Sequence, residues 1–294
     1  GEGAVQSESG TRMKMAATSS SSFDLHPSAF RLLRDPPASG VWNMALDEAL
    51  LEAAVAGRCT LRFYQWEVPT LSLGYFQDVA DRRQHVASQR SPMVRRASGG
   101  GAILHDRELT YSLAIPERHP LAVTRLRTYQ VVHQSLIETL GQWGISASMF
   151  AESPADARPA SVADGVGCGA IDNSSAFLCF QRRAPGDVLV GDAKIAGSAQ
   201  RRAAGAILQH GSVLLARSEA APELDGLFEL TGRAISVEEL IEAWIGHLAA
   251  AFDVSWQNQP LDEAVCARAK VLAAEKYGSL DWTESRRRGG AKKA

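Results

Sequence analysis

The chain has 294 residues, of which 45% are apolar and 22% are charged, a composition typical of a globular protein. Lys and Arg total 31 and Asp and Glu total 33, so the formal net charge of −2 provides no bulk attraction to nucleic acid or to an anionic membrane. No uninterrupted apolar run approaches the ~20 residues of a membrane-spanning helix. The four cysteines (Cys59, Cys168, Cys179 and Cys266) form no C-x-x-C pair. This spacing argues against a disulfide scaffold and a cysteine-based zinc site, and favours a reducing, cytoplasmic environment.

The two ends of the chain differ in composition from the rest. Residues 1–27 are rich in Ser, Gly and Thr without apolar periodicity, so we expect a disordered leader, with Met13 or Met15 as an alternative start. The leader lacks the apolar core of a secretory signal, and its acidic residues count against organellar targeting without excluding it. Residues 284–294 form a basic tail that we interpret as a solvated, frayed end. Residues 28–283 remain for the folded domain.

Helix and strand patterns alternate through the first half of this domain. Asn43 is placed to cap a helix that continues to Val55, with Asp47 and Glu48 near the positive end of its dipole. Period-two alternation and short apolar runs then predict a series of strands. In chain order they comprise residues 61–66, 70–75, 93–96, 102–104 and 110–115, the last two as a hairpin around His105 and Asp106.

The second half begins with a helix whose apolar face carries Tyr129, Val132, Leu136 and Leu140, and Gly144 can end it. Residues 151–175 form a long Pro-, Ala- and Gly-rich loop without periodicity, a length usually linked to function or disorder. The remaining predicted elements are strands at 187–190, 194–200 and 206–215, a helix opened by a capping box at 236–239 with Leu240, Ala243, Trp244, Leu248 and Ala251 on one face, and a last helix at 261–277. Clustered strands with helices before, between and after them indicate an α+β fold with mixed or antiparallel sheets.

A glycine-rich motif stands out at residues 95–106 (RRASGGGAILHD). Three consecutive glycines remove every Cβ, so the backbone can approach a ligand closely and direct N–H groups at an anionic or polarised oxygen. The two arginines supply fixed positive charge. The motif matches neither nucleotide-binding glycine fingerprint. A glycine-rich hairpin without a ligand is the alternative interpretation.

A second motif, residues 191–202 (GDAKIAGSAQRR), places Lys194 among small residues, where a narrow tunnel can bring it to a substrate. The alternative is an exposed lysine on an edge strand. His210 follows in the sequence QHGS, and an isolated histidine of this kind is more often structural than catalytic.

The third candidate is Cys179, in the sequence AFLCF at the exit of the long loop. Its apolar neighbours argue for an inert buried thiol. However, Lys194 follows fifteen positions later across one predicted turn, and together with Arg182 and Arg183 it would lower the pKa of the thiol. A thiolate beside an ammonium is a nucleophile suited to acyl transfer. Cys168, within the long loop, is a minor rival.

In order along the chain, several segments resemble the catalytic domain of the biotin/lipoate protein ligase superfamily. They are WNMALDEAL (42–50), YQW (64–66), PTLSLGYFQ (69–77), the motif at 95–106, LTYS (109–112), KIAGSAQ (194–200), QHGS (209–212), EKY (275–277) and WT (282–283). The resemblance covers residues 30–283 and implies that superfamily's mixed α+β fold. Cys179-Phe180 ahead of Lys194 resembles the octanoyltransferase branch, although residues 181–187 are more basic than is usual there.

The resemblance implies an enzyme without metal or cofactor that works without ATP. Cys179 would accept octanoyl from acyl carrier protein as a thioester, with Lys194 lowering its pKa, and would pass it to a lysine of a lipoyl domain, typically the glycine-cleavage H protein. Leu71, Leu73, Ile103 and Tyr111 are our guess for the acyl-pocket lining. The resemblance assigns substrate binding to Arg95, Arg96, Ser98, Gly99, Gly100, Gly101, His105, Gly197, Ser198, Ala199 and His210.

Four other functions are compatible with parts of the pattern. An ATP-dependent lipoate–protein ligase would use the same motifs with Cys179 incidental, and a transferase between two lipoyl domains would also need Cys179. A biotin ligase is disfavoured because its usual arginine–glycine motif is absent. A non-catalytic module that binds lipoyl domains is the alternative of a different class. We expect a monomer that binds neither nucleic acid nor membrane.

Overall fold

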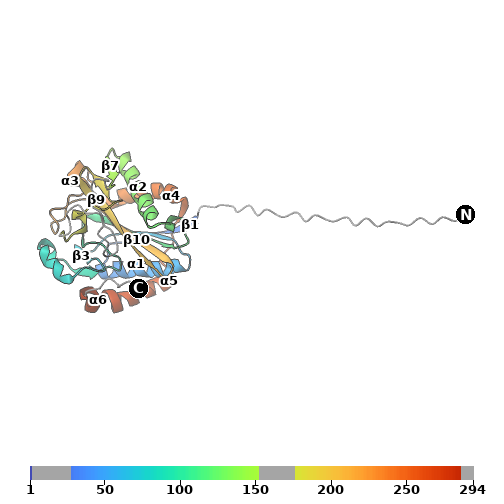
Figure 1. Cartoon of the computed structure of the whole chain (residues 1–294), viewed down its shortest axis with the longest axis horizontal. Coiled ribbons are helices and arrows are strands. Elements are labelled where there is room, and N and C mark those ends of the chain that lie inside the picture. The colour runs from blue at the N-terminus through green and yellow to red at the C-terminus, as the bar shows by residue number, and fades with distance from the viewer. Residues whose placement is uncertain (2–27, 152–175, 286–294) are drawn as a thin grey trace.

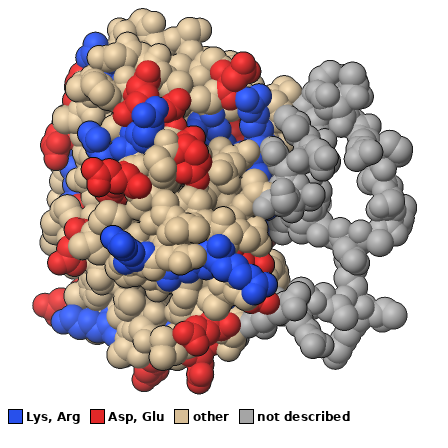
Figure 2. Space-filling view, turned by 90° about the vertical axis from the view of Figure 1, so that its left-hand side faces the viewer, with Lys and Arg blue, Asp and Glu red and all other residues tan. Residues whose placement is uncertain are grey.

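The computed structural model describes Gly1 and residues 28–151 and 176–285. The predicted leader, the loop that holds Cys168 and the basic tail lie outside these ranges except at their edges. No helix within the described ranges is long and apolar enough to cross a membrane. On the face drawn in Figure 2, basic and acidic side chains are interspersed, consistent with the balanced composition.

An eight-stranded mixed sheet forms the centre of the molecule (Figure 1). β1 pairs in parallel with both of its neighbours, and the pairs from β2 to β7 across the sheet are antiparallel. Across the sheet the strands are β11 (Val254–Gln257), β1 (Ser28–Arg34), β2 (Thr60–Tyr64), β6 (Glu108–Pro116), β10 (Ala206–Leu214), β9 (Ala193–Ala203), β8 (Val188–Val190) and β7 (Ala147–Met149). The expected α+β class is confirmed.

Helices cover both faces of this sheet, as Figure 1 shows. α2 and α4 pack on one face, and α1 and α5 pack on the other. Alternation along β6 separates the two: Leu109, Tyr111 and Leu113 join the α2/α4 core, while Ser112 faces α1 and donates to Asp47. The helices are α1 (Gly40–Val55), α2 (Arg125–Gln142), α3 (Leu227–Thr231), α4 (Val237–Phe252), α5 (Glu263–Leu272) and α6 (Leu280–Glu284), with the π-helical turn η5 (Ala273–Tyr277) and the 3-10 turns η1 (Val79–Gln84), η2 (Ala87–Arg90), η3 (Pro120–Ala122) and η4 (Cys179–Gln181).

The predicted hairpin around His105 and Asp106 is wrong. β5 (Ile103–His105) belongs to a separate three-stranded sheet, where it pairs with β3 (Thr70–Leu73), and β3 also pairs with β4 (Met93–Arg95). The turn after His105 leads the chain from this small sheet into β6 of the large one. The turn therefore joins two sheets, and the glycine motif lies along their junction.

Helix boundaries differ from the prediction where a cap was misassigned. Ser39, not Asn43, caps α1 by accepting from the Trp42 N–H at 3.3 Å. Asn43 is buried one turn into the helix, where its amide donates to the Gln65 carbonyl at 3.0 Å. Ser236 does cap α4, accepting from the Glu239 N–H at 3.0 Å, but Ala251 is exposed, whereas Ile241 and Phe252 complete the buried face. The last predicted helix splits into α5 and η5.

Stability should fall as the solution is acidified below neutrality. Burial lowers the pKa of His105, His119 and His133 from the ordinary value of 6.5. The unfolded chain therefore binds more protons than the folded chain between the lowered values and 6.5, so this part of the stability is complete above 6.5 and is lost as the pH falls. We expect the Tm to drop by several degrees between about pH 7.5 and about pH 5.5 at constant ionic strength. A Tm that is flat or rises on acidification would contradict this.

Candidate active site

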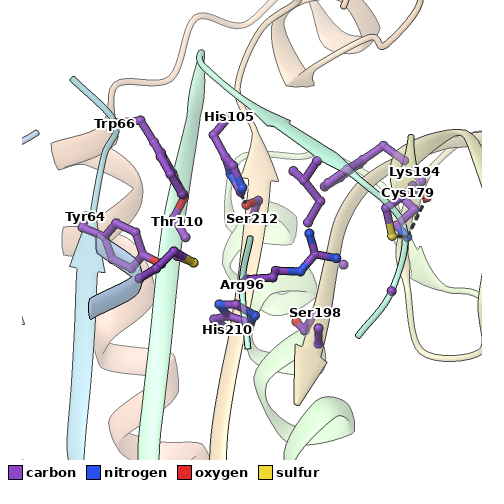
Figure 3. Close-up of a pocket in the computed structure, with 17 residues that line it drawn as sticks. Tyr64, Trp66, Arg96, His105, Thr110, Cys179, Lys194, Ser198, His210 and Ser212 are labelled. Atoms are coloured by element: carbon purple, nitrogen blue, oxygen red, sulfur yellow. Dashed lines mark hydrogen bonds between the residues drawn. The ribbon is translucent and has the colours of Figure 1, made fainter. Parts of the chain in front are cut away.

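A pocket lies on the α1 face of the large sheet and crosses four neighbouring strands (Figure 3). Pairing aligns Tyr64 of β2 with Thr110 of β6, Thr110 with Ser212 of β10, and Ser212 with Gly197 of β9. The space within it, including its open mouth, is about 490 Å³. Its lining comprises Met44, Tyr64, Trp66, Arg96, Gly100, Ile103, His105, Thr110, Cys179, Phe180, Lys194, Gly197, Ser198, Ala199, His210, Gly211 and Ser212. Figure 3 shows Cys179 and Lys194 at one end, with Tyr64 and Trp66 at the other.

Cys179 is held at its end of the pocket by the glycine motif. Its N–H donates to the Ala102 carbonyl at 2.7 Å, and the Ala102 N–H donates to the Phe177 carbonyl at 3.1 Å. A Cβ on Gly101 would approach the Cys179 Cα and N to 3.2 Å. The glycine therefore allows the backbone of the motif to pack directly against that of the cysteine, so the backbones of the two predicted motifs lie in contact.

Lys194 is the second residue of β9, and its side chain reaches back to Cys179. Its Nζ lies 3.8 Å from the Cys179 Sγ and 3.4 Å from the Cys179 carbonyl oxygen. The ammonium also forms a 2.8 Å ion pair with Asp187 and lies 5.2 Å from the centre of the Phe180 ring. The pairing of Cys179 with Lys194 that the spacing suggested is present. Arg182 and Arg183, by contrast, donate to the main-chain carbonyls of Ala176 and Asp192.

Arg96 is a buried cation that organises the glycine motif. It donates to the main-chain carbonyls of Ser72, Gly99 and Gly101 at 3.0, 2.9 and 2.6 Å, and to the Ser72 hydroxyl at 3.0 Å. Burial lowers its pKa to about 10, although the nearby Cys179 favours the charged form. These acceptors are uncharged, so Arg96 brings positive charge to the pocket while it fixes the loop.

Two histidines of the lining are oriented by buried carboxylates. The His105 Nδ1 donates to Glu108 at 2.6 Å, and its Nε2 lies 2.7 Å from the Ser72 hydroxyl. Its ring stacks on Trp66 with the ring centres 3.9 Å apart. The His210 Nδ1 lies 3.5 Å from Asp47, and its Nε2 forms a hydrogen bond with the Ser98 hydroxyl. Both rings are thus held in one orientation, and their ring nitrogens are engaged within the protein.

The structure divides the predicted binding residues. Arg96, Gly100, His105, Gly197, Ser198, Ala199 and His210 line the pocket. Arg95 does not: its guanidinium is fully buried and donates to the carbonyls of Gly74, Gln77 and Thr283 at 2.9, 2.7 and 3.0 Å. Ser98, Gly99 and Gly101 support the loop from behind the lining.

Of the four residues guessed as acyl lining, Ile103 alone lines the pocket. Leu71 and Leu73 pack in the core under the small sheet, and Tyr111 faces the α2/α4 core. The pattern missed Met44, Tyr64, Trp66 and Phe180, although each lies in or beside a segment that the sequence singled out. It also missed Asp187, the ion-pair partner of Lys194. Among the described residues, no cluster of His, Cys, Asp and Glu side chains could hold a metal ion.

A cysteine with a lysine beside it, at the end of a pocket lined in part by a glycine motif, is compatible with nucleophilic acyl transfer. Residues 39–222 match the family described as the lipoyl protein ligase A/B catalytic domain, and the chain belongs to this family. Octanoyltransferase LipM of Bacillus anthracis is 35% identical over 270 residues, 83% of this chain and 94% of the relative. LipM of Geobacillus kaustophilus is 34% identical over 279 residues, 85% and 95% of the two chains. The expected superfamily and its octanoyltransferase branch are confirmed.

Solved structures agree on the fold. A lipoate-protein ligase A bound with ATP superposes with a TM-score of 0.67 at 18% identity, covering 87% of this chain and 99% of the other. A bipartite lipoate protein ligase from Thermoplasma acidophilum gives 0.63 at 19% identity, covering 89% and 98%. At these identities the likeness establishes the fold alone.

Proposed function

We propose that the protein is an octanoyltransferase of lipoate biosynthesis that carries the octanoyl group as a thioester on Cys179. The donor is octanoyl-acyl carrier protein, and the acceptor is a lysine of a lipoyl domain, with the glycine-cleavage H protein as the expected acceptor. The observation that carries the proposal is the Cys179 Sγ at the pocket end, 3.8 Å from the Lys194 ammonium. The octanoyltransferase relatives, which align over most of their length, support the acyl group.

The reaction consists of two acyl transfers. The Cys179 thiolate attacks the donor thioester, the carrier thiolate leaves, and the octanoyl group remains on Sγ. The acceptor amine then attacks this thioester, loses a proton and releases the Cys179 thiolate, leaving an octanoyl amide. Exchange of one thioester for another is nearly isoenergetic and thioester to amide is downhill, so neither step requires a nucleotide.

The surroundings of Sγ fit this chemistry. The Lys194 ammonium stabilises the thiolate and the oxyanion of each tetrahedral intermediate, a contribution that preorganised donors make at about 3–4 kcal/mol each. The Cys179 N–H is not a free donor, because it is bound to the Ala102 carbonyl. Oxyanion stabilisation therefore comes from the side-chain cation in this scheme.

The rest of the pocket suits a saturated chain. The seven carbons beyond the carbonyl would gain a gross ~6 kcal/mol on burial, at ~0.8 kcal/mol each. The two large aromatic residues at the far end of the pocket have polar atoms that are already bonded: the Tyr64 hydroxyl donates to Asp47 at 2.9 Å and the Trp66 indole to Thr110 at 2.8 Å. The acyl chain then meets ring faces at this end, and these two polar groups keep their partners.

Incubation with octanoyl-acyl carrier protein in the absence of ATP, followed by intact mass measurement, tests the proposal. We expect an octanoyl adduct that hydroxylamine removes and that is absent in Cys179→Ser, because the serine hydroxyl is a far weaker nucleophile. Addition of a lipoyl-domain acceptor should discharge the adduct. Product formed only from free octanoate and ATP would instead indicate a lipoate–protein ligase, and failure with both donors would indicate a binding module.

A further inference from the structure

Asp187 is the feature of the site that the two-residue scheme leaves unexplained. Its carboxylate lies 2.8 Å from the Lys194 Nζ, and both side chains are almost fully buried, with exposures of 8% and 3%. A buried carboxylate beside the ammonium partly neutralises the cation that the thiolate needs. Asp187 therefore weakens the positive field at Cys179, and its presence calls for another role in the site. The contacts of its carboxylate and of the turn that carries it indicate that role.

The turn that carries Asp187 is rigid. Residues 184–187 form a reverse turn in which Gly186 has a φ of +96° and the Asp187 N–H donates to the Ala184 carbonyl at 3.0 Å. The Asp187 carboxylate also accepts from the Ala184 N–H at 2.7 Å. The Asp187 carbonyl accepts from the Phe150 N–H at 2.7 Å, which ties the turn to the end of β7. The carboxylate is therefore oriented before it meets the lysine.

His133 of α2 joins this turn to the strand that carries Lys194. Its Nδ1 donates to the Gly186 carbonyl, so its Nε2 is the acceptor for the Ser198 hydroxyl, 2.5 Å away. Burial lowers the pKa of His133, which keeps the ring neutral as this direction requires. Tyr111 donates to the Ser198 oxygen at 2.5 Å, and Gln209 donates to the Tyr111 hydroxyl at 3.0 Å. Each hydrogen bond of this series has one defined direction, and the series ends at the carbonyl of Gly186, the residue before Asp187.

Gly197 provides the space in which Lys194 and Asp187 meet. A Cβ at this position would lie 2.6 Å from the Lys194 Cε, 2.9 Å from its Nζ and 3.0 Å from the Asp187 Oδ1. The lysine atoms are the far end of a flexible side chain, so a methyl group here would displace the ammonium and leave the strand in place. Glycine at position 197 therefore leaves free the space that the Lys194–Asp187 ion pair occupies.

We propose that Asp187 is a positioning residue of the reaction. Its carboxylate, fixed by the 184–187 turn and by the hydrogen bonds of His133, holds the Lys194 ammonium against Cys179. Cys179 and Lys194 are then the catalytic pair, and Asp187 completes a triad by fixing the lysine. Asp187 acts through the lysine and does not touch the substrate. The inference rests on the proposed function, because it concerns the rate at which Cys179 accepts octanoyl.

Single-turnover formation of the octanoyl thioester from octanoyl-acyl carrier protein tests the triad in the full-length protein. In Asp187→Asn we expect the limiting rate to fall by about 10–100-fold, the effect of misplacing one catalytic group. The carrier concentration for half-maximal rate should not change, since Asp187 makes no substrate contact. Asp192→Asn is the matched control, because it removes the same charge from the β8–β9 turn at a side chain that is 98% exposed.

Gly197→Ala disturbs the same Lys194–Asp187 contact by displacing the ammonium. It also tests the proposal if Asp187→Asn fails to fold. It should lower the limiting rate without a matching loss in Tm, and the double variant should lose much less than the product of the two single effects. A limiting rate for Asp187→Asn equal to that of Asp192→Asn, or fully multiplicative effects, would overturn the triad. If the wild-type protein forms no thioester, the proposed function is wrong, and the inference that depends on it is wrong as well.

Discussion

Replacement of Lys194 by methionine is expected to slow octanoyl transfer by about 10²–10³-fold, the usual effect of removing one group that stabilises an oxyanion. Methionine fills a similar volume but carries no charge, so the pocket keeps its shape while the Cys179 Sγ loses the ammonium 3.8 Å away. The rate constants of thioester formation and of acyl discharge to a lipoyl-domain lysine should both fall, because each step passes through an oxyanion at the same carbon.

Stability must be separated from chemistry in this variant. Lys194→Met leaves the Asp187 carboxylate buried without its 2.8 Å partner, and breaking one side of a buried ion pair costs about 3–5 kcal/mol. The double variant Lys194→Met/Asp187→Asn removes both charges, so we expect the Tm to recover while the rate stays low. A double variant that transfers octanoyl at the wild-type rate would show that Lys194 serves the fold alone.

The pairing of Cys179 with Lys194 could be predicted because it depends on local chain geometry. The fifteen-residue interval contains the 184–187 turn and the turn of the β8–β9 hairpin, and together these return the chain to the cysteine. Asp187 lies inside this interval, yet the pattern presents it only as the start of a strand. Its role depends on His133, which reaches the turn from α2, more than fifty residues away. Contacts between segments that are distant along the chain produce no periodic pattern in the sequence.

The errors have the same origin. Short apolar runs correctly predict β5 and β6, but a run does not specify the sheet that its strand joins, so the predicted hairpin combines two strands of different sheets. The two arginines of the glycine motif look equivalent in sequence. Strand alternation sends their side chains in opposite directions, so Arg96 lines the pocket while Arg95 binds carbonyls of the 74–77 segment and α6.

Replacement of Asp47 by alanine is expected to lower the free energy of unfolding by about 3–5 kcal/mol, since the buried Arg62 keeps only Asp35 of its two carboxylate partners and two buried hydroxyls lose their acceptor. Asp47 accepts from Arg62, whose side chain is fully buried, at 2.9 Å, and also from the hydroxyls of Tyr64 and Ser112 at 2.9 and 2.8 Å. Burial alone would raise the pKa of Asp47, but the hydrogen bond from His210 and the charge of Arg62 outweigh it and lower the pKa. Denaturant titration monitored by fluorescence measures the loss.

Glu52→Ala is the matched control, because Glu52 is also an acidic residue of α1 and also binds an arginine. Its ion pair with Arg268 is 2.7 Å long, but the two side chains are 43% and 45% exposed, so its removal should cost no more than about 1 kcal/mol. Comparable losses in the two variants would contradict the assignment of Asp47 as the buried anchor. If the two losses differ as expected, Asp47→Ala should also slow octanoyl transfer, because the same carboxylate orients His210 and Tyr64, both of which line the pocket that contains Cys179.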